Sequence, residues 1–474
     1  MKKKRYLTFQ CIGRSSSEVT QSCYQIIAND HVILLDCGLY QCADPYECYK
    51  VNRYGMDEVR ISRVEYIIIS HANIDHCGVL PYLYKKGCKG ITYVPKGNKK
   101  LLKLMFLDSA KILSTEALKL RHAGVNVLPL YTEKDVEKCM DFIKEQEFNE
   151  SFTLFDGAVC MFSSAHHIVA SAQIDLLFKI QGLTKRIHYT GDIGSPVIPK
   201  YYVENFDPPM KCDLLIGEST YAGVKRPHSN KDRDKDIEKI QTVIRETCIE
   251  KNSKVLFPVF ALDRLQTMLT VLYTMYGNDE SFNIPIIVDT PLGKSICDIW
   301  KDIIKVDKSK WKDVISWNNI KFTSSWEDSL AYQDYKCPMI ILSSSGMCTN
   351  GRSVAWVKSL LPDSNAHICF CGYSAKDTIA SKIKDGKRRV SIEVEGKSYK
   401  NKCGISTLNS FSSHACRSEL LDIYSSCAFE KLLLVHGNRN DKIEFGYELS
   451  RKLSGKSKSS RVITDCMEKV ITLI

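Results

Sequence analysis

Apolar and polar residues alternate with two different periods along residues 1–200. Residues 32–35 and 66–69 are short apolar runs with the length of a buried strand, whereas residues 99–120 carry their apolar side chains at helical spacing. Strands and helices that take turns along a chain usually build a sheet covered by helices. This part of the chain is therefore predicted to have an α/β fold.

A second alternation of the same kind begins near residue 212. It predicts a separate doubly wound lobe, because each short apolar run is followed by a longer helical stretch. The expected strands are 214–216, 255–259 and 284–288, and the expected helices are 232–251, 262–276 and 292–305. After residue 385 short strands return, and we expect a strand at 432–435 and a helix at 444–453.

The overall composition narrows the class of protein and its compartment. With 474 residues, of which 44% are hydrophobic, the chain is expected to form two or three compact lobes. No apolar run approaches the roughly 20 residues that a membrane-spanning helix needs, so no membrane association is expected. The 20 cysteines are scattered without a C-x-x-C pair, which favours free thiols in the reducing cytoplasm.

The net charge of +11, from 66 basic against 55 acidic residues, favours a polyanionic partner such as a nucleic acid. The excess does not identify that partner, because basic runs on a protein surface are more often solvated faces than binding stripes. Charge alone therefore leaves nucleic-acid binding open.

The strongest local signal is the stretch S-H-A-N-I-D-H-C-G at residues 70–78, directly after a predicted strand. It holds His71, Asp75 and His76, and a loop at a strand end can point such side chains at one spot. Imidazole and carboxylate donors suit zinc or a similar divalent ion. The alternative is a polar turn with incidental histidines.

Four more residues of the kinds that bind metals follow other predicted strands: Asp36, His167, Asp192 and His436. One such residue is usually structural. A set of them, each placed after an apolar strand, is expected to gather at one edge of a sandwich around a common cleft.

The order of these residues resembles a known superfamily. Residues 35–38 (L-D-C-G), the cluster around His71, then His167 and residues 189–192 (Y-T-G-D) resemble the four successive metallo-β-lactamase motifs. Those motifs alone leave lactamase, glyoxalase and sulfatase chemistries open.

Further strings narrow the resemblance to β-CASP nucleases. They are E-S-T-Y at 218–221, F-P-V-F-A-L-D-R-L-Q at 257–266, S-S-S-G-M at 343–347, F-S-S-H at 411–414 and L-V-H-G at 434–437. The chain resembles, over essentially its whole length, the catalytic core of the pre-mRNA 3′-end cleavage endonuclease and its short prokaryotic relatives. The resemblance implies an α/β fold in which a metallo-β-lactamase αββα sandwich (residues 1–221 and 386–474) carries an inserted doubly wound β-CASP domain (222–385).

The resemblance also implies a metal centre. By position, His71 and His167 would hold a first ion, Asp75, His76 and His436 a second, and Asp192 would bridge both, while Asp36 would orient the ligand loop. The expected cofactor is zinc, one or two ions per chain, with manganese or iron as alternatives.

Catalytic roles are implied in the same way. His414 would be the general acid and Glu218 would orient it, with Asp75 counted among the catalytic residues. Ser344, Ser345 and Arg264 would donate hydrogen bonds to phosphates.

Asn73 departs from the family pattern. The family motif is His-x-His-x-Asp-His, whereas this chain has His71-Ala-Asn73-Ile-Asp75-His76, with Asn73 at the position of the second histidine. An amide oxygen is a weaker zinc donor than imidazole, so the first ion is expected to bind less tightly. His166 could replace the missing ligand, but adjacent residues of an extended segment point in opposite directions.

Three functions remain in view. The first is a metal-dependent phosphodiesterase that cleaves single-stranded RNA, with single-stranded DNA as an alternative substrate. The second is a catalytically impaired pseudo-enzyme that serves as an RNA-binding or partner-docking scaffold, as a homodimer or with another protein. The third is a small-molecule hydrolase, against which the inserted lobe argues because it would cover the cleft.

Overall fold

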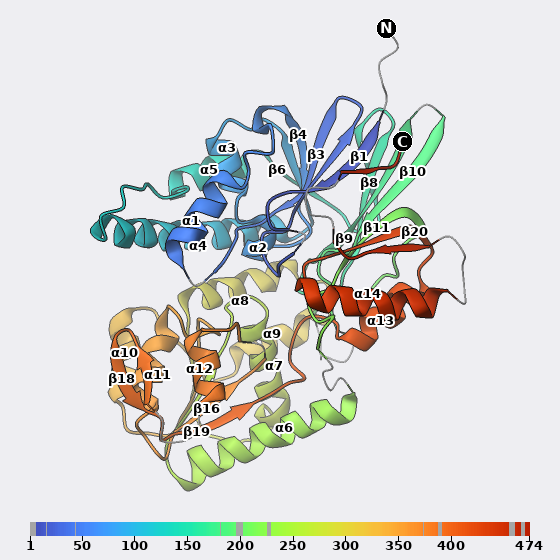
Figure 1. The fold of residues 1–474 in the computed structure, drawn as a ribbon. Helices are drawn as coiled ribbons and strands as arrows, with labels where there is room; N and C mark the ends of the chain where they lie inside the picture. Colours follow the sequence, from blue (N-terminus) through green and yellow to red (C-terminus); the bar gives the residue numbers. More distant parts are fainter. Residues whose placement is uncertain are drawn as a thin grey trace. The chain divides into compact units, whose positions relative to one another are not determined.

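The protein is described by a computed structural model that covers residues 6–15, 17–42, 44–180, 182–195, 202–224, 229–372, 374–386, 391–454, 460–465 and 470–474. The chain divides into two compact units (Figure 1). The sandwich unit comprises Met1–Ser195, Val203–Lys225 and His414–Ile474, and the inserted unit comprises Pro196–Tyr202 and Arg226–Ser413.

The sandwich unit is built on two seven-stranded sheets. The first sheet has the order β22 (Val470–Thr472), β1 (Leu7–Cys11), β2 (Cys23–Ala28), β3 (His31–Cys37), β4 (Val64–Ile68), β5 (Ile91–Pro95) and β6 (Ile143–Gln146). The second has the order β21 (Arg461–Ile463), β20 (Phe429–Val435), β11 (Cys212–Glu218), β10 (Leu183–Tyr189), β9 (Ala172–Ile180), β8 (Ala158–Ser164) and β7 (Ser151–Phe155).

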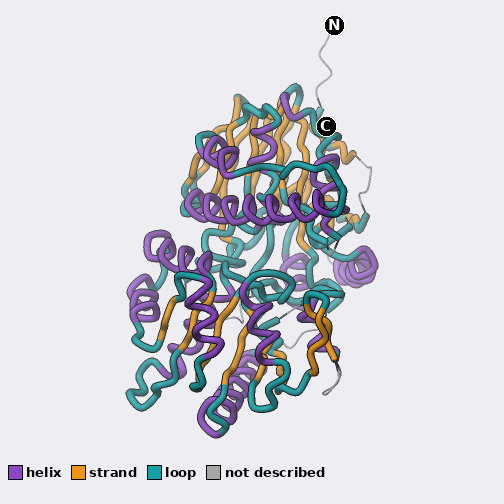
Figure 2. The backbone as a smooth tube through the Cα atoms, turned by 90° about the vertical axis from the view of Figure 1, so that its left-hand side faces the viewer, coloured by secondary structure: helices purple, strands orange, loops and turns teal. Residues whose placement is uncertain are grey.

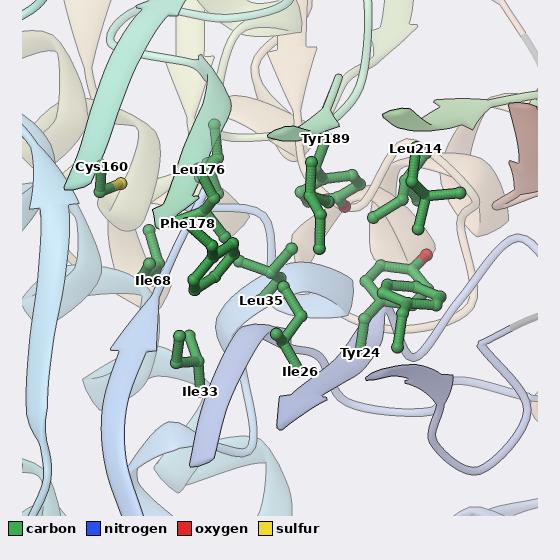
Figure 3. Packing of buried hydrophobic residues seen from close by; sticks show 14 of the residues in the cluster. Tyr24, Ile26, Ile33, Leu35, Ile68, Cys160, Leu176, Phe178, Tyr189 and Leu214 are labelled. Atoms are coloured by element: carbon green, nitrogen blue, oxygen red, sulfur yellow. The ribbon is translucent and has the colours of Figure 1, made fainter. Parts of the chain in front are cut away.

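The core of this unit lies between its two sheets. Because side chains alternate along a strand, Ile26 and Leu35 of the first sheet face Leu176 and Phe178 of the second, and none of these four is exposed (Figure 3). Tyr189, at the end of β10, also points into this layer. Burial of apolar surface at roughly 25 cal/mol per Å² makes this layer the main source of the unit's stability.

Helices cover the outer faces of both sheets. They are α1 (Pro45–Tyr54), α2 (Ile74–Cys77), α3 (Leu80–Lys85), α4 (Asn98–His122), α5 (Glu133–Met140), α13 (Arg417–Ser426) and α14 (Arg439–Leu453), with a 3₁₀ turn at Ile61–Arg63. On the second sheet, Tyr424 of α13 and Phe445 of α14 pack against Leu432 and Leu434 of β20. The αββα arrangement expected for this part of the chain is therefore confirmed.

The inserted unit has an all-parallel six-stranded sheet. Its order is β14 (Ile320–Phe322), β13 (Ile286–Asp289), β15 (Met339–Ser343), β12 (Lys254–Pro258), β16 (His367–Phe370) and β19 (Gly404–Thr407), with a separate hairpin of β17 (Ser391–Val394) and β18 (Lys397–Lys400). Its helices are α6 (Asn230–Ile244), continued by the π-helical turn Arg245–Glu250, α7 (Arg264–Tyr276), α8 (Pro291–Ile303), α9 (Lys308–Ser316), α10 (Trp326–Asp334), α11 (Arg352–Leu360) and α12 (Ile379–Asp385).

Both faces of the parallel sheet are covered, as is usual when helices connect parallel strands. Neighbouring residues such as Ile340 and Ile341 of β15 point to opposite faces, yet neither is exposed. Strands and helices alternate from α6 to α12, except that α9 directly follows α8. Figure 2 draws these strands in orange and the helices in purple. The expected doubly wound architecture is thus confirmed.

Most of the elements expected from the sequence form where they were placed. Residues 99–120 lie in α4, 262–276 overlap α7, and 432–435 end β20. The expected helix at 232–251 becomes α6 followed by the π-helical turn. The inserted unit runs to Ser413, past the boundary expected at residue 385, because β19 pairs with β16 in its sheet.

The cysteines of the described segments are free, in line with the expectation of reduced thiols. Within the same segments, no helix combines the length and the apolar character needed to cross a bilayer.

We expect His367 of β16 to make stability depend on pH. Burial, together with the nearby charges of Lys251 and Lys239, lowers the pKa of this imidazole to about 4. The pKa of a histidine in an unfolded chain is near 6.5. Between pH 6.5 and 4, therefore, His367 binds a proton in the unfolded state but not in the folded state. The free energy of unfolding should therefore fall as the pH drops from 6.5 to 4.

The matched variant is His367→Gln, which cannot titrate. Relative to it, the wild type should lose about 2 kcal/mol of unfolding free energy between pH 6.5 and 4, as measured by urea denaturation. Other titrating groups are common to both proteins and cancel in the difference. Parallel curves would contradict the assignment.

Candidate metal centre

The loop after β4 presents several polar side chains to one place. Asn73 precedes the single-turn helix α2, and its carbonyl accepts hydrogen bonds from the amides of His76 (2.9 Å) and Cys77 (3.1 Å). Gly38 allows this turn to lie against the end of β3, because a Cβ there would be 1.6 Å from the carbonyl oxygen of Asp75. A side chain at residue 38 would push the turn away.

Two groups of side chains in the sandwich unit are arranged as metal sites. The first group is His71, His167 and Asp192, and the second is Asp75, His76 and His436. Within each group the candidate ligand atoms all lie within 4.8 Å of one another. The family resemblance implied this division of the five residues other than Asp192, which it expected to bridge both sets.

Asp192 lies between the groups. Its Oδ1 is 3.3 Å from His76 Nε2 and 3.2 Å from His436 Nδ1, whereas its Oδ2 is 3.7 Å from both His71 Nε2 and His167 Nε2. The carboxylate therefore spans the two groups with one oxygen each.

The buried polar atoms here fit a divalent cation. Both carboxylate oxygens of Asp192 and Nε2 of His71 are buried and have no hydrogen-bond partner. Buried polar atoms without partners cost free energy, and a carboxylate costs most. Imidazole nitrogens and carboxylate oxygens are the donors that zinc prefers besides thiolates.

Asp36 fixes the orientation of His76. Its Oδ2 lies 2.7 Å from His76 Nδ1 and also accepts hydrogen bonds from Ser70 Oγ (2.7 Å) and Tyr189 Oη (2.8 Å). With Nδ1 engaged, Nε2 of His76 faces the carboxylates of Asp75 and Asp192. A carboxylate behind a ligating histidine fixes its tautomer and its ring orientation.

His436 is held in a comparable way. Thr220 Oγ1 is 2.9 Å from its Nδ1, and its Nε2 is 3.3 Å from Asp75 Oδ2. The sequence analysis missed Thr220 and Tyr189 as supporting residues. Both stand in motifs that were recognised for another residue, Thr220 in E-S-T-Y and Tyr189 in Y-T-G-D.

His414 differs from the other histidines because it reaches solvent. Its side chain is 19% exposed, whereas Asp192 and Glu218 beside it are each 1% exposed. Its Nδ1 is 3.5 Å from Glu218 Oε1 and 3.9 Å from Asp192 Oδ2. Glu218 is itself fixed by the amides of Ile193 (3.1 Å) and Thr220 (2.8 Å).

Asn73 lies beside the first group, with its Nδ2 3.3 Å from His167 Nε2. His166 does not take the place of the missing imidazole. Its backbone has a positive φ of 55°, and its Nδ1 lies 2.8 Å from the carbonyl oxygen of Glu204. The first group therefore retains two histidines, a carboxylate and an adjacent amide.

Metal binding requires deprotonated ligands, and the candidate ligands differ in this respect. Burial lowers the pKa of His76 and of His436, but Asp192 and Asp75 outweigh it and raise both pKa values, so a bound cation would displace a proton from these two rings. Burial, reinforced by the nearby charge of His76, lowers the pKa of His71 to about 4. Burial opposes ionisation of Asp75, but its hydrogen bond with His436 and the charge of His76 lower its pKa to about 2. Burial likewise opposes ionisation of Asp192, and His436 and His76 outweigh it, so its pKa lies well below the usual range.

The three residues expected to bind phosphates lie in the inserted unit, after the carboxyl ends of the adjacent strands β12 and β15. Ser344 Oγ donates to Thr290 Oγ1 (3.0 Å), and Ser345 Oγ donates to the carbonyl of Asn350 (3.1 Å). Arg264 has a buried Nε without a hydrogen-bond partner. Open α/β sheets usually bind ligands outside the carboxyl ends of their strands.

Three segments of the chain match known families. Residues 17–140 match the metallo-beta-lactamase superfamily, residues 265–383 match the Beta-Casp domain, and residues 398–458 match the Zn-dependent metallo-hydrolase RNA specificity domain.

Similar proteins come from all three domains of life. Ribonuclease TTHA0252 of Thermus thermophilus is 26% identical over 91% of this chain and 94% of its own length. Transcription termination factor FttA of Methanocaldococcus jannaschii is 26% identical over 92% of this chain and 67% of its own length. Cleavage and polyadenylation specificity factor 73 of Drosophila melanogaster is 26% identical over 92% of this chain and 61% of its own length.

A solved structure supports the fold. The crystal structure of a protein of unknown function from Enterococcus faecalis V583 matches with a TM-score of 0.51 and 10% identity, covering 98% of this chain and 100% of that one. Taken with the matched segments and the two His/Asp groups, these similarities show that the chain belongs to the metallo-β-lactamase/β-CASP family of RNA-processing nucleases.

Proposed function

We propose that the chain is a metal-dependent phosphodiesterase that hydrolyses single-stranded RNA, with His414 as the general acid. The observation that carries this proposal is the placement of His414. It is a solvent-accessible imidazole beside the Asp192 carboxylate that spans two metal-binding groups, and it is backed by a fixed glutamate.

The proposed ligands of one ion are His71, His167, Asp192 and the amide of Asn73. Those of the other are Asp75, His76, His436 and Asp192. When bound, two such ions lower the pKa of a water and neutralise charge that builds on the phosphate. Zinc suits these donors best, and manganese or iron can also use them.

The general acid is needed because cleavage of an RNA strand expels an alkoxide. This leaving group departs readily only if it receives a proton. With Glu218 facing Nδ1 of His414, the proton for the leaving 3′-oxygen would be held at Nε2.

Phosphate binding is the proposed role of Ser344, Ser345 and Arg264. A guanidinium with a buried Nε that lacks a partner is suited to receive an anion, and hydroxyl groups in a loop can donate to phosphate oxygens. The net charge of +11 favours retention of a polyanionic strand.

A second candidate function is an impaired pseudo-enzyme that acts as an RNA-binding or partner-docking scaffold. One observation favours it: the position of a metal-binding imidazole is taken by Asn73, and His166 does not replace it. Under this alternative the first ion would bind too weakly for turnover.

We expect Asn73→His to strengthen metal binding at the first group, because imidazole is a better zinc donor than an amide. Zinc affinity there should rise by more than about tenfold, measured by competition with a chromogenic chelator. The weaker ion of the wild type should leave first during dialysis, so metal content should fall towards one per chain. Equal metal content and affinity in both proteins would contradict the expectation.

Activity of the same pair of proteins distinguishes the two candidate functions. A large gain of RNA cleavage in Asn73→His, from an inactive wild type, would support the scaffold reading. Equal, measurable RNA cleavage by the wild type and by Asn73→His would exclude the scaffold function.

We expect His414→Ala to lower kcat for single-stranded RNA by roughly 100-fold or more, since general acids contribute about 10²–10⁴-fold. Its zinc content should stay at the wild-type level, because His414 is not among the proposed ligands. The matched control is His122→Ala, which removes an exposed histidine at the end of α4. Failure of the wild type to cleave any RNA or DNA with zinc, manganese or iron would refute the proposed activity.

A further inference from the structure

Asp263 adopts a backbone conformation that residues with side chains rarely hold. Its φ is 71° and its ψ is −56°, and the amide of Arg264 donates to the carbonyl of Leu262 (3.0 Å) across it. These are the features of a γ-turn of the strained, positive-φ kind. Glycine adopts this conformation at little cost in free energy, whereas aspartate does not. We therefore expect the Asp263 side chain to make an interaction that offsets the strain.

The carboxylate of Asp263 holds Ser413. Ser413 Oγ donates to Asp263 Oδ2 over 2.5 Å, and the two residues are 8% and 4% exposed. Charge-assisted hydrogen bonds of this length are among the stronger ones in proteins, and burial shields this one from water. Both residues belong to the inserted unit.

Ser413 ends a segment that is fixed at two points. Asp236 of α6 accepts hydrogen bonds from the amide of Asn409 (2.8 Å) and from the amide and the hydroxyl of Ser410 (2.9 and 2.7 Å). Asp263 provides the second point at Ser413, directly before His414.

The chain is also fixed on the other side of His414. The amide of Ala415 donates to the carbonyl of Ile193 (2.8 Å), and the amide of Ile193 donates to Glu218 Oε1 (3.1 Å). Ile193 therefore places Ala415 and Glu218 relative to each other. Ser413, whose hydroxyl Asp263 holds, directly precedes His414 in the chain.

We propose that Asp263 is a positioning residue for the general acid, acting through Ser413 on the peptide that carries His414. This inference rests on the proposed function of His414. It assigns to Asp263 a role separate from that of its neighbour Arg264, which is proposed to contact phosphate.

The step that needs this positioning is the departure of the leaving strand. A water loses a proton to solvent and its oxygen forms a bond to phosphorus, while the bond from phosphorus to the 3′-oxygen breaks. The proton of His414 moves to that 3′-oxygen, and His414 regains a proton from solvent. The products are a 5′-phosphate and a 3′-hydroxyl. A misplacement of about 1 Å in a reacting group can cost on the order of 100-fold in rate.

The test compares Asp263→Gly, Asp263→Asn and Ser413→Ala with two substrates. One is single-stranded RNA, whose leaving alkoxide needs a proton. The other is bis(p-nitrophenyl) phosphate, whose leaving group departs without one. The matched control is Ser410→Ala, which removes a similar serine-to-aspartate hydrogen bond from the same segment.

For RNA we expect Asp263→Gly and Ser413→Ala to lower kcat by roughly 10- to 100-fold with KM unchanged, and the double variant to lose no more than either alone. With the nitrophenyl ester both should retain wild-type rates. Asp263→Asn should recover most of the RNA activity, because its amide oxygen can still accept from Ser413. Ser410→Ala should behave as the wild type with both substrates.

Glycine at residue 263 also separates positioning from stability, because it relieves the strained turn. The thermal midpoint of Asp263→Gly should therefore be close to that of the wild type while its RNA activity falls. Equal losses with both substrates, or full RNA activity in Asp263→Gly, would overturn the proposal.

A crystal structure of Asp263→Gly decides the matter even if the wild type cleaves neither substrate and the proposed function fails. The proposal predicts that the His414 ring moves from its wild-type position beside Glu218, where Nδ1 and Oε1 are 3.5 Å apart. An unmoved ring would overturn it.

Discussion

Burial of the Asp192 carboxylate is the constraint around which the sandwich unit is organised. An ionised carboxylate with no hydrogen-bond partner is unfavourable inside a protein unless positive charge surrounds it. His71 and His76 reach it from the loop after β4, His167 from the loop after β8 and His436 from the loop after β20, and their nitrogens lie 3.2 to 3.7 Å from its oxygens. Because these loops are far apart in the sequence, only the folded sandwich can bring them together.

The backbone conformation at the ends of two strands also contributes to the arrangement of the centre. Asp36, the last residue but one of β3, has a φ of 54°. His436, which directly follows β20, has a φ of 50°. Such left-handed turns are costly for residues other than glycine, and they cluster at functional sites. Here the ring of His436 lies against Asp192, whereas the carboxylate of Asp36 lies against His76. The two-sheet core supplies the rigidity that keeps these turns in place.

Sequence reasoning singled out the residues that the fold gathers into the two His/Asp groups, because each stands in a short motif after a recognisable apolar strand. It could not find Asp263, because its role depends on a turn conformation and on a contact with Ser413, far along the chain. The sequence pattern also did not indicate β19, whose four half-buried residues Gly404–Thr407 form no apolar run. Their place in the sheet follows from pairing with β16, which local pattern does not encode.

The close approach at Gly38 has a counterpart at Gly194, where a Cβ would lie 1.5 Å from the carbonyl oxygen of His166. Neither glycine has a side chain that could bind a metal or substrate. Even so, any side chain at residue 38 would displace the turn of Asp75 and His76, and any at residue 194 would displace the loop of His167. A scan of all substitutions would therefore find residues 38 and 194 as intolerant of change as the residues of the two His/Asp groups. The reason is that the loops of the centre can approach one another only where no side chain occupies the space between them.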